Sequence, residues 1–220
     1  MTNTPGPEIK VSQVAAWFQQ LRQFQRPTGF LTVVRDAATV PNDRFFNDPV
    51  FRPLHEAWAA GHFALGLEAL FGQVEVRLDP DRFPDFHIRL DGNEHGFEFT
   101  TAEKPGRRRG WEHKKRAKDP LLLTPYEPAR GRQEGQLWIA SAVRKKHQKH
   151  YSTSPHLLVY ANFEADALEP SELANACRRW AASFRSIWVL WAYQLVQLFD
   201  SRTFGNADLT WRSVGVDTWD

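Results

Sequence analysis

Two alternating runs on either side of Asp91-Gly92 constrain the fold of this 220-residue chain more than any other feature. Residues 85–91 read DFHIRLD and residues 95–101 read HGFEFTT, so apolar and polar side chains alternate in both runs. Such alternation is typical of a strand with one buried face, and an Asp-Gly pair between two runs favours a tight hairpin turn. We therefore expect two antiparallel strands joined at this pair.

The rest of the chain adds helices and further strands. Apolar residues at helical spacing predict helices over residues 12–24, 53–70, 135–151 and 171–184. Further strands or buried extended segments are expected at residues 29–36, 73–79, 156–163 and 186–199. This order predicts an α/β fold with a mixed central sheet flanked by helices. We expect a single domain over 1–220, with an N-terminal helical addition over 1–50, a core over 51–165 and a C-terminal helix and strand extension over 166–220.

Composition narrows the class of protein. The first ten residues are polar and contain no apolar signal core. The longest apolar stretch, residues 187–199, contains two glutamines and is too short to span a membrane. We expect a cytoplasmic protein without a membrane partner. The single cysteine, Cys177, excludes an internal disulfide and a paired-cysteine zinc site.

Positive charge is concentrated in one stretch. Residues 104–118 carry eight Lys or Arg and one acid, a net charge of +7, so the total of +2 leaves −5 for the other residues. A second basic cluster follows at residues 144–149. Either run alone is compatible with a solvated surface, but two runs beside a carboxylate pair favour a polyanionic partner.

The hairpin brings a pair of carboxylates within reach of each other. Asp85 begins the first strand and Glu98 lies on the second, so both can lie at the same end of the sheet. Two neighbouring carboxylates repel unless a cation lies between them, and Mg²⁺ or Mn²⁺ needs few protein ligands. The sequence therefore predicts a Mg²⁺ or Mn²⁺ site at Asp85 and Glu98; two unrelated surface acids are the alternative.

The sequence PDFHIRL, followed by FEFTTA, a helix with VRKKHQKHY and the strand HLLVYANF, resembles the PD-(D/E)XK nuclease superfamily over roughly residues 53–163. The resemblance implies a restriction-endonuclease-like αβββαβ core and a Mg²⁺-dependent endonuclease or nuclease-like protein that cleaves phosphodiester bonds. It implies that Asp85 and Glu98 bind the metal. In this family a lysine two residues after the second acid activates the attacking water, but here that position is Thr100.

The missing lysine can be replaced from the following helix. Lys146 lies three residues after Val143 and seven after Ile139, on the helix face that meets the core. We therefore assign the third catalytic position to Lys146, with Lys149 as a further candidate on nearly the same face. Lys145 is expected to point outward. A solvated run of lysines at the end of the helix is the alternative.

Further residues are assigned around this site. The possible accessory residues are Glu56, Glu68, Thr100, Lys149 and His87. The residues expected to contact nucleic acid, with DNA favoured, are Lys104, Arg107, Arg108, Arg109, Lys114, Lys115 and Arg116. Two alternatives stand beside the nuclease: a catalytically inactive nuclease-fold protein that serves as a DNA-binding or regulatory module, and an interaction protein whose basic loop meets an acidic partner.

Overall fold

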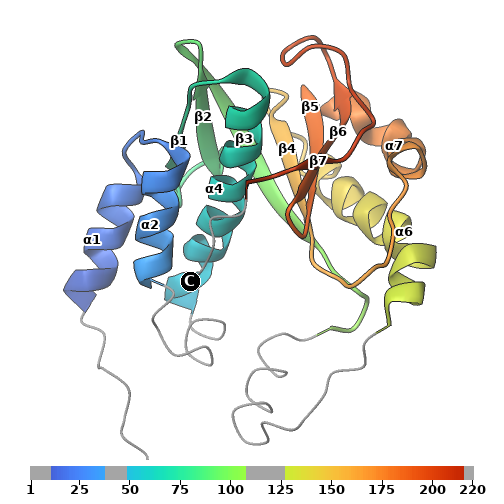
Figure 1. Ribbon diagram of the computed structural model, residues 1–220, viewed down its shortest axis with the longest axis horizontal. Coiled ribbons are helices and arrows are strands. Elements are labelled where there is room, and N and C mark those ends of the chain that lie inside the picture. The colour runs from blue at the N-terminus through green and yellow to red at the C-terminus, as the bar shows by residue number, and fades with distance from the viewer. Residues whose placement is uncertain (1–10, 38–48, 108–126, 216–220) are drawn as a thin grey trace, which may run out of the picture.

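The computed structural model describes residues 11–37, 49–107 and 127–215. Its centre is a curled mixed sheet of seven strands, with helices on both faces (Figure 1). The strands follow one another across the sheet in chain order, β1 to β7. Neighbouring strands are antiparallel except for the pairs β3–β4 and β4–β5, which are parallel. The expected α/β class with a mixed, helix-flanked sheet is confirmed.

The strands have the following bounds: β1 Val74–Leu78, β2 Phe86–Leu90, β3 Asn93–Ala102, β4 His156–Ala161, β5 Ser186–Trp191, β6 Gln194–Asp200 and β7 Arg212–Ser213. The helices are α1 Val11–Leu21, α2 Pro27–Ala37, α4 Arg52–Phe71, α6 Pro128–His147 and α7 Pro170–Cys177. Two 3₁₀ segments, η1 Pro49–Phe51 and η2 Arg178–Ser183, precede α4 and follow α7. Helix, three strands, helix and strand thus occur in the expected order. The finer assignment to a restriction-endonuclease-like core stays a prediction, as does the division into domain segments.

The hairpin forms where the sequence indicates it. Leu90 pairs with Asn93, and the two residues between them, Asp91 and Gly92, both have positive φ, at 48° and 78°. This is the backbone that a two-residue hairpin turn requires, and Asp and Gly tolerate it better than most residues. Continuing the β2–β3 register beyond the Phe86–Phe97 pair places Asp85 opposite Glu98.

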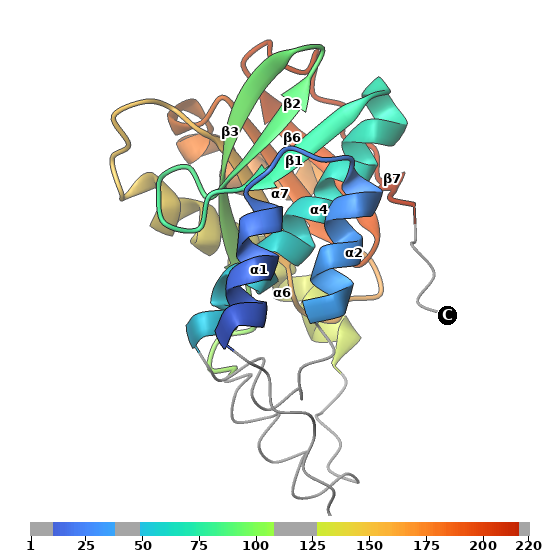
Figure 2. The ribbon, with the colours of Figure 1, turned by 90° about the vertical axis from the view of Figure 1, so that its left-hand side faces the viewer.

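Two of the expected elements are wrong. Residues 29–36 form part of helix α2 rather than a strand, and α2 packs against α4 (Figure 2). Residues 186–199 form two strands, β5 and β6, because the chain turns at Ala192 and Tyr193. The helix expected over 171–184 begins at Pro170, with Glu169 as its N-cap residue, and changes to the 3₁₀ segment η2 after Cys177.

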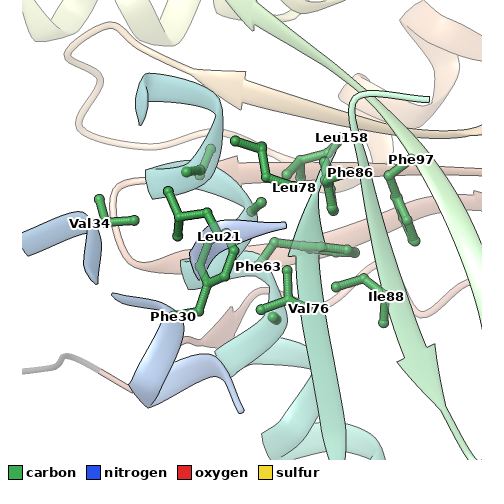
Figure 3. Close-up of a cluster of buried hydrophobic side chains, with 14 of the residues drawn as sticks. Leu21, Phe30, Val34, Phe63, Val76, Leu78, Phe86, Ile88, Phe97 and Leu158 are labelled. Carbon is green, nitrogen blue, oxygen red and sulfur yellow. The ribbon is translucent and has the colours of Figure 1, made fainter. Parts of the chain in front are cut away.

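The sheet separates two apolar cores. One core fills the space between the sheet and α1, α2 and α4, and Figure 3 shows Phe63 and Phe97 among its side chains. The Phe63 ring packs edge-on against Phe97 and Trp188. The other core lies under α6 and α7 and contains Ile139 and Val143. On the same helix Leu137 is 61% exposed, whereas the neighbouring Trp138 is buried in this core. Among the described residues, no helix has the length and apolar character needed to cross a membrane.

Candidate functional site

Asp85 stands just before β2, where its carboxylate is held against the neighbouring strand. Its Oδ2 accepts a hydrogen bond from the backbone N–H of Phe99 on β3, at 2.7 Å. Glu98, the residue before Phe99, is 3% exposed and projects toward α6. The hairpin register therefore brings two carboxylates that are 13 positions apart in sequence to the same place beside α6.

Lys146 reaches this carboxylate pair from α6. It follows Val143 by three residues, so both side chains lie on the buried face of the helix, and Lys146 is only 9% exposed. Its Nζ donates to Glu98 Oε2 and lies 3.4 Å from Asp85 Oδ2. Lys145 is exposed, as expected from the helical phase. The structure thus brings together the three residues to which the sequence assigned the catalytic role.

Tyr151 is a member of the cluster that sequence reasoning missed. Its hydroxyl donates to Glu98 Oε2 at 2.8 Å, and Phe83 stacks on its ring with the ring centroids 5.0 Å apart. Burial and the hydrogen bond to Glu98 raise the pKa of Tyr151, so it stays a neutral donor. The predicted helix extended to Tyr151, whereas α6 ends at His147, so helical periodicity could not place this side chain.

Glu56 brings a third carboxyl group toward the site from the first turns of α4. Its side chain is 17% exposed and lies 3.7 Å from Arg52 Nε, itself an exposed group. Burial, followed by the charge of Asp85, raises the pKa of Glu56 to about 7. Burial is also the largest cause that raises the pKa of Asp85, while Lys146 opposes that rise. At neutral pH, Glu56 can therefore take up or release a proton beside a fixed positive charge.

The other accessory residues differ in their relation to the cluster. Lys149 is 58% exposed and lies 3.9 Å from Glu98 Oε2, so it belongs to the edge of the cluster. Thr100 is half-buried two residues after Glu98 on β3. Glu68 lies elsewhere, 2.6 Å from Arg26.

His87, a possible accessory residue, contacts Glu94 rather than Asp85. Its Nδ1 lies 2.7 Å from Glu94 Oε1, and its cross-strand neighbours are Arg77 and Gly96. Continued to Asp85, the β2–β3 register puts His87 and Asp85 two positions apart on one face of the sheet.

The basic residues assigned to nucleic acid are only partly described. Lys104 forms an ion pair with Glu127, and Arg107 donates to the backbone carbonyl of Asn162 at 2.9 Å. Both cations therefore already have partners within the protein. The remaining assigned residues lie outside the described residues: Arg108, Arg109, Lys114, Lys115 and Arg116. A nucleic-acid partner stays a prediction.

The carboxylate pair offers the kind of ligands that Mg²⁺ prefers. Asp85 and Glu98 turn one oxygen each toward a shared positive centre, Lys146 Nζ. Two hard oxygen donors suit Mg²⁺ or Mn²⁺, which keep several waters. Across the described ranges, however, no group of three or more His, Cys, Asp or Glu is arranged to hold a metal. A cation at this site would thus have two protein ligands and would share the carboxylates with Lys146.

Comparison with known proteins gives one structural likeness. No family model matches the chain, and no curated protein matches it. Among solved structures, a protein of unknown function from Pseudomonas aeruginosa strain PAO1, described as a member of the Monooxygenase Superfamily, matches with a TM-score of 0.42 and 18% sequence identity. The match covers 89% of this chain and 98% of the other.

These comparisons correct the family expected from the sequence. The structure that matches carries a monooxygenase-superfamily description, and no family model or curated relative indicates a PD-(D/E)XK nuclease. The predicted nuclease identity and phosphodiester cleavage, together with the inactive nuclease-fold module, are therefore wrong on these findings. At this TM-score and identity, the likeness does not carry the monooxygenase description over to this chain either.

Proposed function

We propose that Glu56, Asp85, Glu98 and Lys146 form an acid–base site that binds a divalent cation, Mg²⁺ or Mn²⁺. One observation carries the proposal: the buried Lys146 Nζ contacts Glu98 and lies 3.4 Å from Asp85, so two carboxylates from adjacent segments converge on one positive centre. Buried charges are costly unless they are paired, and clusters of this kind occur preferentially at functional sites.

Each residue has a distinct part in this proposal. Asp85 and Glu98 would hold the cation, which supplies a fixed positive charge that polarises an oxygen of a bound substrate or water. Glu56, with its pKa raised to about 7, would give or take a proton near neutral pH. Lys146 would stabilise negative charge that develops on the substrate. Tyr151 would orient Glu98 through its hydroxyl hydrogen bond.

Isothermal titration calorimetry with Mn²⁺ tests the proposal. We expect weak binding to the wild-type protein and loss of most of that binding in Glu98→Gln, because the cation loses an anionic ligand. Glu94→Gln is the matched control: it removes a carboxylate four positions earlier on β3, where Glu94 pairs with Arg77 at 2.8 Å. This control should bind Mn²⁺ as the wild type does.

Proton release gives a second measure of the same site. A cation at Asp85 and Glu98 should lower the pKa of Glu56 by Coulomb interaction, so binding near pH 7 should release protons. Titrations in two buffers with different ionisation enthalpies measure that release, which Glu56→Gln should abolish. Equal Mn²⁺ binding in the wild type and Glu98→Gln, or absence of binding in both, would leave the cluster as a structural ion pair.

A further inference from the structure

A hollow lies away from the carboxylate–lysine cluster, between α7, η2 and strands β5 and β6. It has a volume of about 630 Å³, within the range of small-molecule sites. Its wall is mainly apolar, and the residues that form the wall are Ala174, Cys177, Ala181, Ile187, Leu198 and Phe199. Leu209 lines the same hollow and is 41% exposed, so a large apolar side chain is accessible to solvent at the hollow.

The helical segment gives this hollow two kinds of edge. Ala174, Cys177 and Ala181 follow one another at spacings of three and four residues and form an apolar row. Ser171, Asn175 and Arg178 form a second row at the same spacings, and all three are exposed. The hollow is thus apolar along one side of the helix and polar along the other.

Arg178 is the only charged residue among the described residues that line the hollow, and no acid lines it. Within the part of the chain that the structure describes, Arg178 forms no ion pair. Arg179, the next residue, is different: its guanidinium lies over the Trp180 ring, 4.9 Å from the centroid, and it does not line the hollow. An arginine free to pair favours an anionic ligand group.

The reactivity of the wall is low. Cys177 is 2% exposed, and burial raises the pKa of its thiol to about 12. The thiolate is the nucleophilic form, so Cys177 serves here as a small apolar wall residue. Binding rather than covalent chemistry is what this hollow can supply.

We infer that the hollow binds a small amphipathic monoanion of the fatty-acid type, with its apolar body against the accessible side chains of Ala174, Phe199 and Leu209 and its carboxylate on Arg178. The apolar wall supplies the burial of the body, and the Arg178 guanidinium, the one charge among the described lining residues, selects a negative head group. This site is independent of the proposed acid–base function, since it shares no residue with the carboxylate–lysine cluster.

Calorimetric titration with decanoate, below the concentration at which it forms micelles, tests the inference. Decanol has the same body without the charge, and acetate has the head group without the body. We expect decanoate to bind most tightly of the three. Arg178→Gln should weaken decanoate binding by about tenfold or more, because a hydrogen bond between charged groups is lost. The same change should leave decanol binding unaltered.

Two further variants complete the test. Arg179→Gln is the matched control and should bind decanoate as the wild type does. Ala174→Phe, at a half-buried wall position, should fill the hollow and weaken decanoate and decanol alike, with circular dichroism to verify the fold. The inference is overturned if wild-type protein does not bind decanoate, if decanoate and decanol bind equally, or if Arg178→Gln and Arg179→Gln have the same effect. It is also overturned if Arg185→Gln, at the adjoining hollow of about 430 Å³, weakens binding while Arg178→Gln does not.

Discussion

Glu56→Gln should make the protein more stable above pH 7, although it removes a charged residue from the candidate site. Burial raises the pKa of Glu56 from 4.5 to about 7, so folding works against the ionised form of this carboxyl group. Each pKa unit corresponds to about 1.4 kcal/mol, so the ionised carboxylate costs about 3 kcal/mol of folding free energy at pH 8. Glutamine carries no charge and does not have this cost.

The gain from Glu56→Gln has a defined pH dependence. Between pH 4.5 and 7 the folded protein keeps the Glu56 proton, whereas the unfolded chain releases it. The contribution of Glu56 to the free energy of unfolding of the wild type therefore falls as pH rises. The difference between variant and wild type should be near zero at pH 4, should grow by about 1.4 kcal/mol per pH unit, and should level off above pH 7. His156, whose pKa burial lowers to about 3, acts in the opposite direction but is common to both proteins and cancels.

Urea denaturation at a series of pH values measures this difference directly. Glu68→Gln is the matched control on the same helix, where Glu68 pairs with Arg26 on the surface, and it should change stability by less than about 1 kcal/mol at every pH. If Glu56→Gln gave no gain at pH 8, or a gain independent of pH, Glu56 would not be the buried, proton-exchanging group that the site requires.

Two other substitutions test the packing around the site and the core. Lys146→Met should lower the free energy of unfolding by about 3–5 kcal/mol at pH 7, because it leaves Glu98 buried without its cation. Lys145→Met, on the exposed face of α6, should change it by no more than about 0.5 kcal/mol. Equal losses in urea denaturation would refute the placement of Lys146 on the buried face. Phe63→Ala should lower the free energy of unfolding by about 3–5 kcal/mol, because Phe63 is fully buried against Phe97 and Trp188. Leu137→Ala, at a position that is 61% exposed, should lower it far less. A small loss for Phe63→Ala would contradict the described core.

Local sequence signals predicted the hairpin and the placement of Lys146 because both depend on short-range geometry. Asp91-Gly92 supplies the positive φ values that the turn needs, and the register that follows sets Asp85 opposite Glu98. Lys146 shares the buried face of α6 with Val143 because three residues make nearly one helical turn. The meeting of these residues in space is not local: Lys146 is 48 positions from Glu98 and 61 from Asp85 in sequence, and the helical phase of α6 alone does not bring it to them.

The missed elements depend on tertiary contacts. Residues 29–36 contain two adjacent valines and a threonine, which favour strands, yet they form α2 because that helix packs against α4. Gly61 allows this approach, since a Cβ atom there would lie 2.5 Å from Leu31 Cδ2. The β5–β6 turn was missed because Ala192 adopts a φ of 50° without the Gly or Asn that normally marks such a turn. Neither cause can be read from a local pattern.

The central claim is that Asp85 and Glu98 hold a divalent cation beside Lys146, and crystals soaked in Mn²⁺ test it most directly. An anomalous difference map identifies Mn²⁺ independently of water and lighter ions. The account predicts a peak between the Asp85 and Glu98 carboxylates, with the Lys146 ammonium displaced from Glu98 toward the solvent side. A map without a peak at these two carboxylates, with Lys146 still bound to Glu98 at saturating Mn²⁺, would contradict it.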